Sequence, residues 1–166
     1  MSNVYFISDL HIGHKNIHKY RDEFKSEQEH REFIFDQWQA VVGKRDKVFV
    51  LGDSSFTVEG LEALSKLAGN KFLVIGNHDT ERVSIWDFQR AFSGVSGLVN
   101  YREFWLSHAP LHPSELRGKL NIHGHTHNVC VPDERYLNVC VEQVMGRPID
   151  LNEVRRRFKL RTFLED

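Results

Sequence analysis

Hydrophobic and polar positions follow two alternating patterns along the first half of the chain. Short continuous apolar runs at residues 3–8, 47–51 and 71–75 are typical of strands that are buried on both faces. Between these runs apolar residues recur at helical spacing, which predicts helices over residues 26–42 and 58–68. The first half therefore alternates strands with helices.

Two of the predicted helices begin with recognisable capping signals. Ser26 precedes Glu29 at capping-box spacing, and Asp150 precedes Glu153 at the start of a last helix. A further amphipathic helix is predicted over residues 82–92. Helical spacing also places three aromatic side chains in the core, while His30 is expected to lie on an exposed helix face. The three aromatic residues are Phe33, Trp38 and Trp86.

The second half of the chain changes to short strands, predicted at residues 103–106, 120–123 and 136–141. Alternation of strands and helices, followed by a strand-rich region, predicts an α/β layered fold with a pair of mixed sheets. At 166 residues the chain has the commonest size of one domain, so we expect a single domain over residues 1–166.

Five polar runs follow the predicted strands, and they contain most of the ten histidines. In open α/β sheets, ligands bind outside the carboxyl ends of the strands. The pattern therefore predicts that the five runs meet in one pocket. The runs are Asp9-Leu10-His11, Gly52-Asp53, Gly76-Asn77-His78-Asp79, Ser107-His108 and Gly124-His125-Thr126-His127.

The side chains in these runs are typical metal ligands. Asp9 and His11 are two residues apart, which points both side chains the same way in extended backbone, and His125 and His127 repeat this spacing. Imidazole, carboxylate and amide ligands suit Mn, Fe, Ni, Co or Zn, with Mn preferred here. The candidates exceed the needs of one ion, which implies two divalent ions sharing one carboxylate. The seven candidate ligands are Asp9, His11, Asp53, Asn77, His108, His125 and His127.

Charge and composition narrow the function classes. The formal net charge is −1, so no global positive field attracts nucleic acid or an anionic membrane. The longest apolar runs are far shorter than the roughly 20 residues that span a bilayer. Two cysteines without an evident leader favour a reducing cytoplasm. One local basic run could contact nucleic acid, although such a run is more often a solvated helix face: Arg155, Arg156, Arg157, Lys159 and Arg161.

The five ordered blocks, D-x-H, G-D, G-N-H-D, H and G-H-x-H, resemble those of the calcineurin-like metallophosphoesterases over residues 5–141. The resemblance implies a β-sandwich of mixed sheets flanked by helices, with a dinuclear metal centre and no cap domain. It assigns Asp53 as the bridging ligand and His78 as the group that either donates a proton to the leaving oxygen or stabilises charge in the transition state. The first ion would be bound by Asp9, His11 and His127, and the second by Asn77, His108 and His125.

The sequence departs from the wider family at one position. Many relatives carry a second aspartate three residues after the G-D block, which orients the histidine equivalent to His78. This chain has Phe56 there, and Asp79 or a backbone carbonyl are the candidates to replace it. The G-D-x-x-D-R-G block of phosphoprotein phosphatases is also absent, which disfavours a protein phosphatase.

The predicted activity is hydrolysis of a phosphodiester or phosphomonoester by a hydroxide that bridges the two ions. A small phosphodiester or a nucleotide is favoured, because no sizeable insertion encloses the pocket. His14 follows the first block in a loop, where it either contacts the substrate or is simply solvated. Two alternatives remain: a nuclease, and a catalytically silent metal-binding interaction module. No membrane partner is expected.

Overall fold

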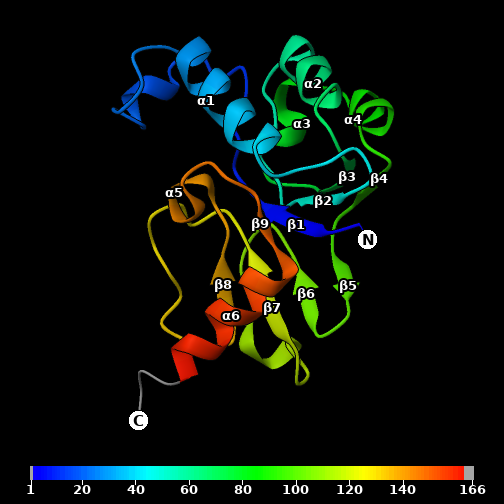
Figure 1. Ribbon diagram of the computed structural model, residues 1–166, viewed down its shortest axis with the longest axis vertical. Coiled ribbons are helices and arrows are strands. Elements are labelled where there is room, and N and C mark those ends of the chain that lie inside the picture. The colour runs from blue at the N-terminus through cyan, green and yellow to red at the C-terminus, as the bar shows by residue number, and fades with distance from the viewer. Residues whose placement is uncertain (1, 163–166) are drawn as a thin grey trace.

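Two β-sheets form the centre of the fold, as the computed structural model shows for residues 2–162, with side chains described up to Lys159 (Figure 1). The first sheet has the order β4-β3-β2-β1-β9, in which β1 to β4 are parallel and β9 is antiparallel to β1. Its strands are β1 (Val4–Ile7), β2 (Lys47–Val50), β3 (Asn70–Val74), β4 (Gly94–Ser96) and β9 (Ile149–Asp150).

The second sheet has the order β5-β6-β7-β8, with β5 antiparallel to β6 and the other pairs parallel. The three strands predicted in this half are present, although the last is short because α5 (Val141–Val144) begins directly after Cys140. The strands are β5 (Val99–Tyr101), β6 (Phe104–Leu106), β7 (Leu120–His123) and β8 (Tyr136–Asn138).

Helices flank the sheets. In Figure 1, α1 (Glu27–Gln39) and α2 (Val58–Ser65) lie over the first sheet, whereas α6 (Leu151–Thr162) lies beside the second. The predicted caps are present: the Ser26 hydroxyl accepts a hydrogen bond from the Glu29 amide at 3.1 Å, and the Asp150 carboxylate accepts one from the Glu153 amide at 2.8 Å. The arrangement is the predicted α/β fold of mixed sheets flanked by helices.

The helix predicted over residues 82–92 is instead two helices, α3 (Asp79–Arg82) and α4 (Ile85–Ala91). Val83 between them is extended, and the Ser84 hydroxyl caps α4 by accepting from the Trp86 amide. This break shifts the buried face to Phe88 and leaves Trp86 67% exposed, so its prediction as a core residue is wrong. The same prediction fails for Phe33, which is exposed, and succeeds for Trp38, which is fully buried.

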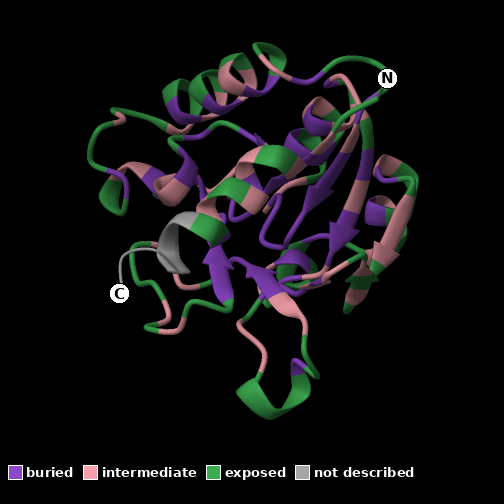
Figure 2. Cartoon of the chain, turned by 60° about the horizontal axis from the view of Figure 1, so that its bottom comes forward, coloured by how far each residue is buried: buried purple, intermediate pink, exposed green. Residues whose placement is uncertain are grey.

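Aromatic side chains join the two sheets. Phe6 and Phe49 stack on the first sheet with ring centroids 5.7 Å apart, and Tyr101 of the second sheet lies 5.1 Å from the Phe49 ring. Burial of such a side chain contributes about 1.5–3 kcal/mol to stability. Figure 2 shows the buried strands in the middle of the molecule and the exposed residues on the outer helix faces. The sheets therefore pack as a sandwich.

The topology brings the ends of distant strands together. Ile7 pairs with Val50, and Val50 pairs with Leu73, so β1, β2 and β3 end at the same edge of the first sheet. A parallel bridge between Ser8 and Cys140 connects this edge with the segment that leaves β8. The helices that the structure describes include none that is long and apolar enough to cross a bilayer.

Candidate metal centre

Three predicted ligands meet around one position at the end of β1. The Oδ1 atom of Asp9 lies 3.6 Å from Nε2 of His11 and 3.7 Å from Nε2 of His127. The Oδ1 atom of Asp9 and Nε2 of His11 are buried and have no hydrogen-bond partner. Since an unpaired buried polar atom is costly, this group of atoms is arranged for a ligand.

A second group of ligand atoms lies beside the first. Nε2 of His108 is 2.9 Å from Oδ1 of Asn77 and 3.2 Å from Nδ1 of His125. The other nitrogen of His108 lies 2.8 Å from the Leu51 carbonyl oxygen. Donation of its proton to that carbonyl leaves Nε2 with a free lone pair, which is the tautomer that a metal ligand requires.

Asp53 stands between the two groups. Its Oδ2 atom lies 3.7 Å from Nε2 of His11 and 3.4 Å from Nε2 of His108, while its Oδ1 atom accepts a hydrogen bond from the His78 amide. Ligand atoms about 2.0–2.2 Å from one divalent ion lie roughly 2.8–3.6 Å apart in octahedral or tetrahedral geometry. The observed spacings of 2.9–3.7 Å are close to this range, so the residues fit two ions.

Backbone conformation distinguishes the ligands from other residues. Eight non-glycine residues among those described have positive φ angles, and five of the eight are candidate ligands. Residues in this conformation are uncommon and concentrate at functional sites, because each costs about 1–3 kcal/mol. The prediction of extended backbone for the pairs Asp9/His11 and His125/His127 is therefore wrong. The left-handed conformation of these residues orients their side chains instead. The five ligands are Asp9, His11, Asp53, His125 and His127.

The carboxylates are ionised in the metal-free protein. Burial would raise the pKa of Asp9, but the neighbouring imidazoles of His11 and His108 outweigh it and hold the pKa below its usual value. The pKa of Asp53 is lowered as well, since the interaction with His108 outweighs burial. In turn, burial acts to lower the pKa of His108, but Asp53 raises it to about 8. Protons and metal ions therefore compete for the same group of atoms.

The family model of the calcineurin-like phosphoesterases matches residues 2–159 of this chain. The chain belongs to the calcineurin-like phosphoesterase family. The family is metal-dependent, so membership agrees with the donor atoms gathered at the strand ends. The phosphoesterase has candidate ligand sets in place, among them Asp9, Asp53 and His108, whose ligand atoms lie within 4.8 Å of one another.

Alignments with known relatives cover nearly the whole length of this chain. The Gene 66 protein of Mycobacterium phage L5 is 36% identical, and the alignment covers 93% of each chain. A protein of unknown function from Aquifex aeolicus has a similar structure, with a TM-score of 0.75, 26% identity and coverage of 94% of this chain and 99% of that chain. A novel archaeal phosphodiesterase shares the fold at a TM-score of 0.51 and 19% identity, covering 90% and 99%.

His78 has a carboxylate partner that the sequence analysis missed. Its Nδ1 atom lies 2.9 Å from Oε1 of Glu81, one helical turn further along α3. Asp79, one of the two predicted substitutes, has another role: it accepts hydrogen bonds from the backbone amides of Asp53, Ser54 and Gly76. Asp79 therefore joins two ligand loops, and Glu81 is the carboxylate that contacts the His78 ring. The i, i+3 spacing would have indicated Glu81 if the helix had been predicted to begin at Asp79.

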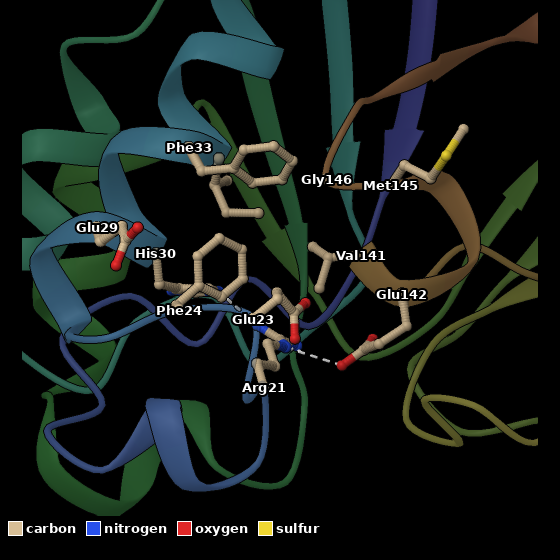
Figure 3. A pocket seen from close by; sticks show the side chains of 11 residues that line it. Arg21, Glu23, Phe24, Glu29, His30, Phe33, Val141, Glu142, Met145 and Gly146 are labelled. Carbon is tan, nitrogen blue, oxygen red and sulfur yellow. Dashed lines mark hydrogen bonds and ion pairs between the residues drawn. The ribbon is translucent and has the colours of Figure 1, made fainter.

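A buried ion pair supports the other end of the phosphoesterase centre. Glu142 accepts a hydrogen bond from Nδ1 of His127 at 3.0 Å. It also accepts one from Arg21 at 2.8 Å (Figure 3). Arg21 is 4% exposed and also donates to the Asp9 carbonyl at 2.7 Å. Its guanidinium lies 2.7 Å from Nε2 of His30, which is fully buried, so the expectation that His30 is exposed is wrong. Arg21 and Glu142 are far apart in sequence, and no local pattern indicated this pair.

Cys140 fixes the orientation of Asp9. Its thiol, the Ser8 hydroxyl and the His125 amide lie 3.1, 2.6 and 2.8 Å from Oδ2 of Asp9 and donate to it. Burial and the nearby Asp9 carboxylate raise the pKa of the Cys140 thiol, so the sulfur keeps its proton and acts as a donor. Saturation of Oδ2 leaves Oδ1 of Asp9 free to face His11 and His127.

A pocket of about 530 Å³ opens over the centre and includes both His11 and His127 in its lining. His14 lines it too, with a buried Nδ1 atom that has no partner and a pKa lowered by burial and by the charge of His11. The alternative of a simply solvated His14 therefore does not describe its position. Asn77 and His125 are exposed at the surface, so the centre is accessible from solvent.

The basic run on α6 is largely neutralised by acidic partners. Arg155 pairs with Glu103 at 2.6 Å, and Arg157 pairs with Glu153 at 2.8 Å. Arg156 contacts the same Glu153 carboxylate. The side chain of Arg161 lies outside the described residues. None of the run's described side chains lines the pocket over the metal centre.

Proposed function

We propose that the protein hydrolyses a small phosphate ester, with a phosphodiester or nucleotide favoured, at a centre of two divalent metal ions. The observation that supports this proposal best is the convergence of all seven predicted ligands at spacings that suit two ions. Their proposed division follows the two groups of atoms: Asp9, His11 and His127 hold the first ion, Asn77, His108 and His125 the second, and Asp53 contacts both.

Two such ions would lower the pKa of the attacking water and neutralise charge that develops on the phosphate. Mn²⁺ is our first choice, because the donor set contains oxygen and imidazole nitrogen and no thiolate. The phosphoryl oxygens would lie against the cluster of imidazoles. In the imidazolium form of His78, Nδ1 would donate to Glu81 and the opposite nitrogen would carry the proton that passes to the leaving oxygen. Such help is typically worth about 10² to 10⁴ in rate.

The nuclease alternative has less support, because the arginines of α6 are paired with acids and lie outside the pocket over the metal centre. A silent binding module has less support too, since none of the seven ligand residues is replaced. The protein would act on a small substrate in the cytoplasm without a membrane partner, and a nucleic-acid partner is possible but not favoured.

The test is turnover of bis(p-nitrophenyl) phosphate and p-nitrophenyl phosphate by metal-stripped protein after restoring Mn²⁺. Metal content is counted in the same sample. Two bound ions with preference for the diester would identify a phosphodiesterase, whereas preference for the monoester would identify a phosphatase of small substrates. Fewer than two ions, or no turnover of either ester, would contradict the proposal.

A further inference from the structure

The pocket over the metal centre is larger than a phosphate group needs. Its volume of about 530 Å³ is within the range of pockets that hold small organic ligands, about 300–1,000 Å³. Beyond the metal ligands, its lining includes Ile17, Tyr20, Phe56 and Arg82. These residues line the space that is left once a phosphate lies at the centre.

Aromatic rings form a continuous wall from the metal centre to the rim of this pocket. The Phe56 ring stacks on the ring of His11, with centroids 5.3 Å apart and an interplanar angle of 26°. The His14 ring is nearly perpendicular to the rings of Phe56 and Tyr20, with centroid distances of 4.9 Å and 5.7 Å. We call Phe56, His14 and Tyr20 the ring wall. It begins beside a metal ligand because Phe56 stands where many relatives have an aspartate.

Tyr20 is the outermost residue of the ring wall and is exposed to solvent. It is 77% exposed, and its hydroxyl has no hydrogen-bond partner within residues 2–162. Arg82, in the same lining, likewise has no ion-pair partner in the described chain, whereas Arg21 and Glu81 are paired with Glu142 and His78. Tyr20 and Arg82 thus offer the pocket an exposed aromatic ring and an unpaired cation, and both are able to bind a planar, electron-rich group.

We propose that the ring wall is a binding subsite for a planar aromatic group carried by the phosphate ester, which stacks on Tyr20 and Phe56 while the phosphate lies at the metal centre. The inference rests on the proposed function, since it assumes that the phosphate occupies the centre. It narrows the substrate class to aryl or heteroaryl phosphate esters. Stacking of one planar ring on aromatic side chains supplies roughly a 5- to 150-fold gain in affinity.

The test compares ligands that share one head group and are not phosphate esters. Binding of phenylphosphonate, cyclohexylphosphonate and methylphosphonate to the Mn²⁺-loaded protein is measured by calorimetry. We expect phenylphosphonate to bind at least 5-fold more tightly than the other two. In Tyr20→Ser and Phe56→Leu that ratio falls toward 1. Trp86→Ser removes another exposed aromatic residue, which lies on α4 and does not line the pocket, and this variant should keep the ratio of the native protein.

The possible results distinguish failure of this inference from failure of the proposed function. Equal binding of all three phosphonates would overturn the ring subsite while leaving a phosphate site at the centre. Equal binding of the phenyl and cyclohexyl ligands, both tighter than methyl, would overturn the requirement for a planar ring. Failure of every phosphonate to bind the metal-loaded protein would overturn the proposed function and this inference together. Metal content and circular dichroism of each variant confirm that it is folded and loaded.

Discussion

Glu142→Gln should weaken metal binding without removing a metal ligand. In the native protein the Glu142 carboxylate accepts hydrogen bonds from His127 and Arg21, and these interactions outweigh burial and lower its pKa from 4.5 to about 2. A carboxylate partner fixes the tautomer and ring orientation of a metal-binding histidine, and losing it typically costs 10- to 100-fold in affinity. We therefore expect the first ion to bind about 10- to 100-fold more weakly.

The same substitution has a separate cost in stability. The lowering of the Glu142 pKa from 4.5 to about 2 corresponds to at most about 3 kcal/mol at neutral pH. The amide oxygen of the new glutamine can still accept a hydrogen bond, and Arg21 still donates one to the Asp9 carbonyl oxygen. We therefore expect the free energy of unfolding to fall by about 1–3 kcal/mol. Because the pKa of Glu142 is depressed on folding, this contribution is complete above pH 4.5 and is lost as the pH falls through about 2. The difference between native and variant proteins should shrink over that interval.

The assay is calorimetric titration of the metal-free protein with Mn²⁺, combined with denaturant unfolding. The first site should weaken while the second, which does not include His127, keeps its affinity within a few-fold. Glu115→Gln is the matched control, because Glu115 pairs with Arg117 on the exposed surface and should change neither quantity. Unchanged affinity at both sites in folded Glu142→Gln would refute the reasoning that Glu142 positions His127.

Three further predictions concern turnover and pH. Glu81→Gln should slow hydrolysis of an alkyl phosphate ester by about 10-fold but hardly affect a p-nitrophenyl ester, whose leaving group needs no proton; equal losses would contradict a role through His78. Asp53→Asn should abolish turnover, whereas His78→Ala should slow turnover and retain the bound metal. Turnover rates and the metal content of each variant check this prediction. Because the pKa of His108 is raised from 6.5 to about 8, the metal-free protein should lose up to about 2 kcal/mol of stability as the pH rises from below 6.5 to above 8, while its affinity for metal increases. Denaturant unfolding and metal titration at pH values below and above this interval check the two signs.

Of the site residues that the sequence analysis does not predict, one is indicated by a local sequence pattern. Glu81 is three residues after His78, the spacing of neighbours on one helix face, but the helix was predicted to begin only at Arg82. The error arose because α3 is a single turn, too short to show an apolar period. Glu142, Arg21 and Cys140 left no such signal, since their contacts with the ligands join segments that are distant along the chain.

The sequence by itself determined which residues are polar at the ends of buried strands. Burial imposes the local apolar period that predicts a strand, and parallel strands end at one edge, so the convergence of Asp9, Asp53 and Asn77 follows from pattern and topology. Only the tertiary structure decided how these side chains are aimed. The left-handed φ angles of Asp9 and His11, the donors on Asp9 and the ring wall all depend on contacts between segments that approach each other only in the folded chain. A local sequence pattern cannot predict such contacts, because they depend on how the whole core packs.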